Sequence, residues 1–161
     1  MTQRHYAENT EVAVDRSRAE IDRLLMRYGA TSFIYGSNQN SSMVAFEMGG
    51  RRIKFVLPMP DRNAEEFTHG RRNQYFSSTT RLTPAQAYAK YEQACRVRWR
   101  GLVLCIKAKL EAVESGIETF EEAFLPHIVM ASGKTVGEVL IPDLARITET
   151  GKMTPLLGAG S

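Results

Sequence analysis

The stretch Met43-Val-Ala-Phe-Glu-Met-Gly-Gly-Arg-Arg-Ile-Lys-Phe-Val-Leu57 decides the fold of this chain. It holds two alternating runs separated by Gly49-Gly50, and alternation is the period of a half-buried β-strand. Both central residues of a type I′ turn require positive φ, so the glycine pair predicts a tight hairpin. Strands are therefore expected over residues 43–48 and 51–57. A further strand over residues 32–36 would complete a three-stranded antiparallel meander.

Helices are predicted before and after this sheet. Before it, Ser17 and Glu20 have the spacing of a capping box, and apolar residues then recur at helical intervals until Gly29. After it, Thr83 caps a helix with Pro84 at its first position, and helical propensity continues to residue 115, a length of about 48 Å. Three strands with one apolar face need a cover, and this long helix is the only element large enough to provide it.

The whole chain predicts one core domain with an extension. At 161 residues it is long enough for one domain with a core and short for two. The expected α+β core domain covers residues 1–116 and consists of an N-terminal helix and a three-stranded antiparallel meander covered by one long helix. Residues 117–161 are expected to form short C-terminal helices, with cap signals at Thr119 and Thr135, and a tail.

Charge is distributed unevenly along the chain. Between His69 and Leu110 there are nine Arg or Lys residues and a single acid, Glu92, whereas residues 111–161 hold three basic and eight acidic residues. Aromatic residues are interleaved with the cations. Because basic side chains bind phosphates and bases stack on flat aromatic rings, this pattern favours a nucleic-acid partner. A solvated charged helix face is an equally good interpretation.

The predicted interface has two parts, a loop and a helix. The loop over residues 68–82 combines cations, amides and aromatics without periodicity, and long loops of this kind are either functional or disordered. On the long helix, Trp99 is either a platform for base stacking or, as tryptophan more often is, part of the core. The candidate nucleic-acid-binding residues are Arg71, Arg72, Tyr75, Phe76, Arg81, Lys90, Arg96, Arg98, Trp99 and Arg100.

No catalytic, cofactor or metal-binding motif accompanies this charge. Cys95 and Cys105 lie too far apart on one predicted helix for a disulfide, and they lack the Cys-x-x-Cys spacing of a zinc site. Glu66 and His69 have the spacing of half a di-iron motif, but no second copy exists. Residues 133–135 match the last three positions of a phosphate-binding loop, but the first glycine of that motif is missing. We therefore expect a non-enzymatic protein without cofactor or metal.

The sequence also bears on membrane contact and on the cellular compartment. No run of about eighteen apolar residues exists, and the polar N-terminus is unlike a signal peptide. The two cysteines are expected to be free thiols. A cytoplasmic protein with no membrane contact is the expectation.

Four segments are familiar when they are taken together: Ser17-Arg-Ala-Glu-Ile, Tyr28-Gly-Ala, Ile106-Lys-Ala-Lys-Leu-Glu-Ala-Val-Glu-Ser-Gly-Ile-Glu-Thr-Phe-Glu-Glu-Ala-Phe and Thr135-Val-Gly-Glu. In these segments the chain resembles a family of small uncharacterised proteins carried by bacteriophages and prophages, over most of residues 12–157. The resemblance implies a phage accessory protein that acts in the bacterial cytoplasm. It supplies no activity and no functional residue.

Three functions stay open at this point. The first is nucleic-acid binding, most of all single-stranded DNA binding or annealing, because strand-strand-strand-helix is also the core order of phage single-strand annealing proteins. That analogy rests on topology and charge alone. The second is binding and inhibition of a host defence protein through Arg and aromatic anchors. The third is self-assembly, in which the acidic end of one subunit meets the basic stretch of the next. A homo-oligomer is expected.

Overall fold

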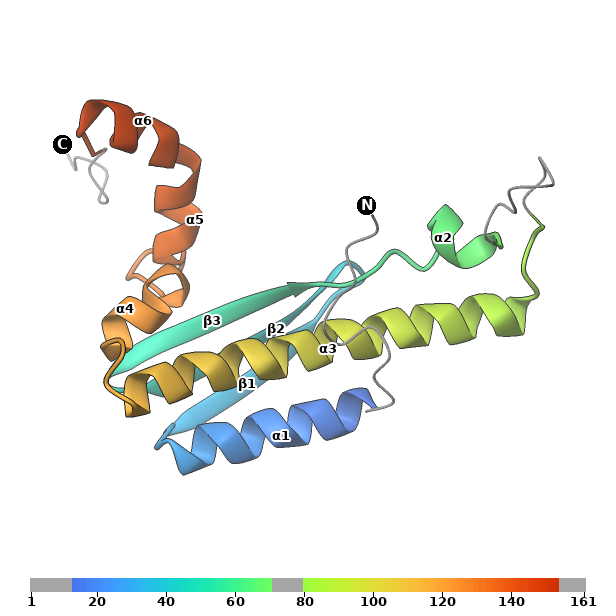
Figure 1. The fold of residues 1–161 in the computed structure, drawn as a ribbon, viewed down its shortest axis with the longest axis horizontal. Coiled ribbons are helices and arrows are strands. Elements are labelled where there is room, and N and C mark those ends of the chain that lie inside the picture. The colour runs from blue at the N-terminus through green and yellow to red at the C-terminus, as the bar shows by residue number, and fades with distance from the viewer. Residues whose placement is uncertain (1–12, 71–79, 154–161) are drawn as a thin grey trace.

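The computed structural model describes residues 13–70 and 80–153 of the chain. Its antiparallel sheet has the order β1 (Ser32–Ser37), β2 (Ser41–Met48) and β3 (Arg51–Pro58). The long helix α3 (Pro84–Glu114) runs along the sheet, and α1 (Val14–Arg27) lies beside α3 (Figure 1). This is the α+β architecture that the sequence predicts.

The hairpin between β2 and β3 forms at the glycine pair. Gly49 and Gly50 have φ values of +59° and +70°, and Met48 pairs with Arg51 across the turn. Alternate side chains of both strands are buried, because successive residues of a strand point to opposite faces of the sheet. The buried set is Val44, Phe46, Met48, Ile53, Phe55 and Leu57.

Helix α3 begins at the predicted cap and covers this apolar face. The Thr83 hydroxyl accepts a hydrogen bond from the Gln86 N–H, and the Gln86 side chain accepts one from the Thr83 N–H. Each buried residue of α3 lies three or four positions from another one, so they share one side of the helix. They are Cys95, Trp99, Leu102, Val103, Ile106 and Leu110. Ile21 and Leu25 of α1 close the core beside them.

Helix α1 begins earlier than its sequence signal indicates. Ser17 was expected as the N-cap, but the helix starts at Val14, and Ala13 occupies the cap position without a side-chain hydrogen bond. Ser17 is completely buried, and its hydroxyl has no hydrogen-bond partner among the described residues. It lies four residues before Ile21, on the side of α1 that faces the core. Packing of that apolar side sets the orientation of the helix and overrides the cap signal.

The core continues past residue 116 into α4 (Phe120–Phe124). Phe124 is fully buried, and its ring packs edge to face against Phe46 and Phe55, with centroid distances of 6.1 and 6.3 Å. The Thr119 hydroxyl and the Glu122 side chain form the predicted capping box at the start of α4. The C-terminal part of the chain is therefore attached to the sheet through aromatic packing.

Short elements follow α4 at the C-terminal end of α3. They are the 3₁₀-helix η1 (Leu125–His127), α5 (Val136–Leu140), the 3₁₀-helix η2 (Ile141–Asp143) and α6 (Leu144–Thr150). Thr135 caps α5, as its sequence position predicts. At the opposite end of α3 lies α2 (Glu65–Thr68), a short helix that directly precedes the loop expected over residues 68–82 (Figure 1).

Two tyrosines connect α1 to its neighbours. Tyr35 of β1 donates a hydrogen bond to the Asp22 carboxylate, and its hydroxyl is also 3.3 Å from the Arg18 carbonyl oxygen. The Tyr28 hydroxyl lies 3.0 Å from the Glu111 carboxylate and 2.7 Å from that of Glu114. The pKa of Tyr28 is raised to about 12, first by the hydrogen bond to Glu114. Burial and then the bond to Asp22 raise the pKa of Tyr35.

These raised pKa values predict a loss of stability in alkali. A phenol whose pKa is higher in the folded state stabilises the fold fully below its unfolded pKa of about 10, and this contribution is lost as pH rises toward the folded pKa. We expect the thermal midpoint to fall between about pH 9 and pH 11.5. The fall should be smaller in the double variant Tyr28→Phe/Tyr35→Phe, measured by circular dichroism. An equal fall in both proteins would contradict this account.

Candidate functional site

The structure describes six of the ten residues predicted to bind nucleic acid. Arg71, Arg72, Tyr75 and Phe76 lie outside the described residues. The other six lie on α3 or just before it. Their environments divide them into residues engaged inside the molecule and residues that are available to a ligand.

Trp99 belongs to the core. Its side chain is 1% exposed, and the Arg18 guanidinium lies 4.5 Å from the centroid of its ring. The Tyr35 ring is next to it, at a centroid distance of 6.2 Å. The prediction of a base-stacking platform at Trp99 is therefore wrong. The residue falls in the middle of the sheet-facing side of α3, where no base can reach its ring.

Arg96 and Arg100 form ion pairs inside the molecule. Arg100 pairs with Glu20 of α1, and both side chains are largely buried. Arg96 pairs with Glu92 one helical turn earlier, at 3.9 Å, so the only acid of this stretch is already engaged. Their charges are partly neutralised, which makes both residues weaker candidates for phosphate binding than the sequence indicates.

Arg81, Lys90 and Arg98 remain available. All three are exposed, and none forms an ion pair with another residue of the described ranges. Arg81 is held in place because it bridges His69 in antiparallel fashion, with flanking backbone hydrogen bonds between residues 68–70 and 80–82. Lys90 and Arg98 lie on the first half of α3, about 12 Å apart along its axis.

The structure adds two residues that the candidate set lacked. Tyr88 of α3 is 46% exposed, and the Arg62 guanidinium lies 5.3 Å from the centroid of its ring. Phe67 of α2 packs edge to face on Tyr91, at 5.9 Å, and this contact holds α2 against α3. Tyr88 had a signal in the sequence, since it is one of the aromatic residues interleaved with the cations of this stretch. Arg62 had none, because only the fold brings it to Tyr88.

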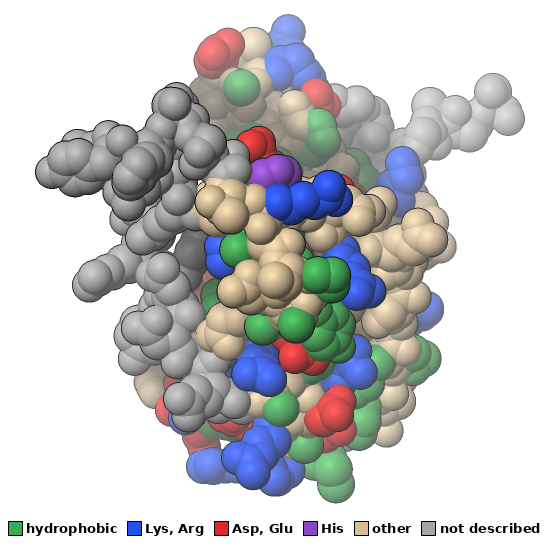
Figure 2. Space-filling model, turned by 90° about the vertical axis from the view of Figure 1, so that its right-hand side faces the viewer, with side chains coloured by type: hydrophobic (Ala, Val, Ile, Leu, Met, Phe, Trp, Pro, Cys, Tyr) green, Lys and Arg blue, Asp and Glu red, His purple; other side chains and the backbone are tan. Residues whose placement is uncertain are grey.

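We call Arg62, Arg81, Tyr88, Lys90 and Arg98 the basic end. Figure 2 views the molecule from the side on which α2 and the start of α3 lie. Lys and Arg side chains occur at several places on this face, with hydrophobic side chains and fewer acidic ones between them. The basic end thus combines unpaired cations with an exposed aromatic ring that already carries a guanidinium.

Comparisons with protein-family models, with curated proteins and with solved structures found no match for this chain. The resemblance to small phage proteins therefore stays a prediction. Within residues 13–70 and 80–153, no helix combines the length and the apolar character needed to cross a membrane. In the same ranges, no three His, Cys, Asp or Glu side chains are grouped so that they could hold a metal ion.

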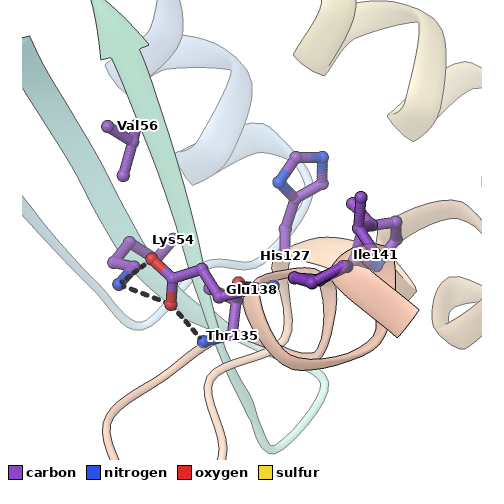
Figure 3. A pocket seen from close by; sticks show the side chains of 9 residues that line it. Lys54, Val56, His127, Thr135, Glu138 and Ile141 are labelled. Atoms are coloured by element: carbon purple, nitrogen blue, oxygen red, sulfur yellow. Dashed lines mark hydrogen bonds and ion pairs between the residues drawn. The ribbon is translucent and has the colours of Figure 1, made fainter. Parts of the chain in front are cut away.

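A hollow of about 370 Å³ lies at the other end of the molecule, beside β3 (Figure 3). The Lys54 ammonium on its wall is 3.2 Å from the Glu138 carboxylate, which also accepts a hydrogen bond from the Thr135 N–H. His127 stacks on Phe55 at a ring distance of 3.9 Å. Its pKa is lowered, first by burial and then by the charge of Lys109, so the imidazole is neutral at pH 7.

Gly137 allows α5 to approach η1 at this hollow. A Cβ at this position would lie 2.7 Å from the Pro126 carbonyl oxygen, which belongs to the backbone. We expect Gly137→Ala to lower the free energy of unfolding by about 1–3 kcal/mol. Gly101→Ala, in the middle of α3 with open space around the new Cβ, should raise it by about 0.5–1 kcal/mol. Urea unfolding measures both, and effects of the same sign would contradict the packing argument.

Proposed function

We propose that this protein binds nucleic acid at the basic end and prefers single-stranded DNA. One observation carries the proposal. Arg81, Lys90 and Arg98 keep exposed, unpaired charges within the described residues, whereas Arg96 and Arg100 of α3 are paired with acids. Exposed cations with no internal partner bind phosphate without first losing another interaction.

The residues of the basic end take different roles in this proposal. Arg81, Lys90 and Arg98 contact phosphates and release counterions, which supplies affinity without reading sequence. Tyr88 stacks on a base and Arg62 adds a cation above the stack. Because every base has a flat face, this contact tolerates any sequence.

The exposed ring favours single strands over duplex. The bases of a duplex are stacked on one another, so Tyr88 could reach one only after unstacking, whereas the bases of a single strand are accessible. With the resemblance described above, we propose a phage accessory protein that coats or anneals single-stranded DNA in the bacterial cytoplasm. Several copies would bind along one strand, and no catalytic step is involved.

The acidic residues of the C-terminal half give little support to assembly through opposite charges. Glu111 and Glu114 both lie within hydrogen-bond distance of the single Tyr28 hydroxyl, Glu121 lies 3.7 Å from Arg51, and Glu122 caps α4. Carboxylates with partners in their own subunit gain less from the basic stretch of another. A host protein with an acidic surface would bind at the same basic end. A direct binding measurement is therefore needed to distinguish such a protein from a nucleic acid as the partner.

Fluorescence anisotropy with labelled single-stranded DNA, duplex DNA and RNA of equal length tests the proposal. We expect the tightest binding for single-stranded DNA. Raising the salt from about 50 to 200 mM should weaken binding, with a slope in log K against log salt of about 0.7 per phosphate contact. Absence of binding to all three ligands at low salt would refute the proposal and direct the search to an acidic protein partner.

A further inference from the structure

The outer edge of β1 is unpaired in the part of the chain that the structure describes. β1 lies at one edge of the sheet, with β2 as its neighbour (Figure 1). The Asn38 N–H donates to the Ser41 carbonyl oxygen, and residues two apart on a strand direct their backbone groups to the same side, so the even-numbered residues of β1 bond to β2. The N–H and C=O groups of Phe33, Tyr35 and Ser37 therefore point outward, where no other described residue forms a hydrogen bond with them.

β1 lacks the features that usually protect a free edge. Its sequence, Ser-Phe-Ile-Tyr-Gly-Ser, contains no charged residue and no proline, and its pairing with β2 is continuous from Ser32 to Ser37, without a bulge. Charges, prolines and bulges are the devices that keep an edge strand from pairing with another chain. The other edge strand, β3, is partly covered, because the Val129 N–H donates to the Arg52 carbonyl oxygen. β1 is thus the edge that is open to a further strand.

Exposed apolar side chains surround this edge on both faces of the sheet. Phe33, 37% exposed, lies on the face that packs against the helices, since it pairs with a buried residue of β2. Ile34 points to the opposite face and is 64% exposed. Met26 is 66% exposed and follows Asp22 of α1 by one turn, so it lies on the side of α1 whose carboxylate binds the Tyr35 hydroxyl. Exposed apolar side chains gathered in this way mark an interaction surface.

We propose that β1 pairs with β1 of a second copy of this chain, so that the two sheets join into one continuous sheet. Antiparallel pairing about a twofold axis presents the same edge from both copies, so each open N–H of one strand meets an open C=O of the other. In this register Tyr35 pairs with Tyr35 of the second copy, and Phe33 pairs with Ser37. Each of these pairs exchanges two backbone hydrogen bonds.

The charge of this edge favours a second copy as the occupant. Identical strands that pair about a twofold axis bring like charges close together, and such contacts are destabilising. β1 has no charged side chain, so its pairing with itself meets no repulsion of this kind. The lack of cations also makes the strand unsuited to a nucleic acid, whose phosphates bind basic side chains. The contact would bring Phe33 and Ile34 of each copy against the strand of the other and so remove apolar surface from water.

Sedimentation velocity of the full chain over a range of concentrations, without DNA, tests the proposal. We expect the wild type to form dimers at micromolar concentration. Ser37→Pro removes an outward N–H and leaves the hydrogen bonds to β2 in place. Because one intersubunit hydrogen bond is lost from each copy, the Kd of the dimer should rise about 30-fold. The matched control Ser37→Ala also loses the hydroxyl that lies 3.2 Å from Ser42, but it keeps the N–H and should dimerise like the wild type.

Amide hydrogen exchange of the wild type, followed by NMR, is a second measurement that does not depend on the folding of a variant. The Tyr35 amide should become more protected as protein concentration rises, because the second copy covers it. The Ile34 amide, which bonds to β2 within one copy, is the internal control and should change less. Both measurements are independent of nucleic-acid binding, since no DNA is present and β1 contributes no residue to the basic end.

Three outcomes would overturn the proposal. The first is a wild type that stays monomeric up to about 1 mM, a concentration at which even a weak specific dimer forms. The second is a Ser37→Pro dimer as stable as that of the wild type, which would place the contact elsewhere on the molecule. The third is protection of the Tyr35 amide that is independent of concentration, which would show that a segment of the same chain covers the edge.

Discussion

Replacement of Trp99 by alanine is expected to lower the free energy of unfolding by about 3–5 kcal/mol. The indole is 1% exposed and fills the space where α1, β1 and α3 meet. Alanine would leave a cavity there and would remove the contact with the Arg18 guanidinium, 4.5 Å from the ring centroid. Because small proteins are stable by only about 5–15 kcal/mol, the loss is a large share of the total.

Urea unfolding followed by far-UV circular dichroism measures this effect, since Trp99 is the only tryptophan and its fluorescence is lost in the variant. Tyr88→Ala is the matched control. It removes an aromatic ring from the same helix at a site that is 46% exposed, and it should cost less than about 1 kcal/mol. In the wild type, acrylamide should quench Trp99 weakly with or without DNA. Strong quenching that DNA suppresses would contradict the burial of Trp99 and would indicate that its ring contacts DNA.

The triple variant Arg81→Gln/Lys90→Gln/Arg98→Gln is expected to bind single-stranded DNA about 100-fold more weakly. Each exposed ion pair with a phosphate is worth at most about 1 kcal/mol, and three of them correspond to about two orders of magnitude in Kd. The slope of log K against log salt should also decrease by about 2, because three phosphate contacts disappear at about 0.7 each. Anisotropy titrations at several salt concentrations measure both quantities.

A charge-matched control distinguishes the effect of local contacts on DNA affinity from the effect of net charge. Arg51→Gln/Arg52→Gln/Lys134→Gln removes the same charge from exposed positions far from the basic end. Arg51 and Arg52 already lie near Glu121 and Glu47. This control should keep most of the affinity and of the salt slope. Equal losses in both triple variants would show that binding depends on net charge alone and would refute the basic end as a specific interface.

Local features of the fold followed from short stretches of sequence. The hairpin formed at Gly49-Gly50 because positive φ is a property of the residues themselves. The caps at Thr83, Thr119 and Thr135 formed because each hydroxyl reaches a backbone N–H three residues later. Ser17 had the same signal and failed, because burial of the apolar side of α1 started the helix earlier.

The candidate site depended more on distant contacts. The nine cations between His69 and Leu110 were visible in the sequence, but their availability was not. Arg100 meets Glu20, 80 residues away, and Arg62 reaches Tyr88 only through the docking of α2. The sequence by itself thus determined the elements, their caps and the amount of charge, because these depend on neighbours within one or two turns. The tertiary structure alone decided which cations are neutralised and that Trp99 is buried, because both depend on which surfaces pack together.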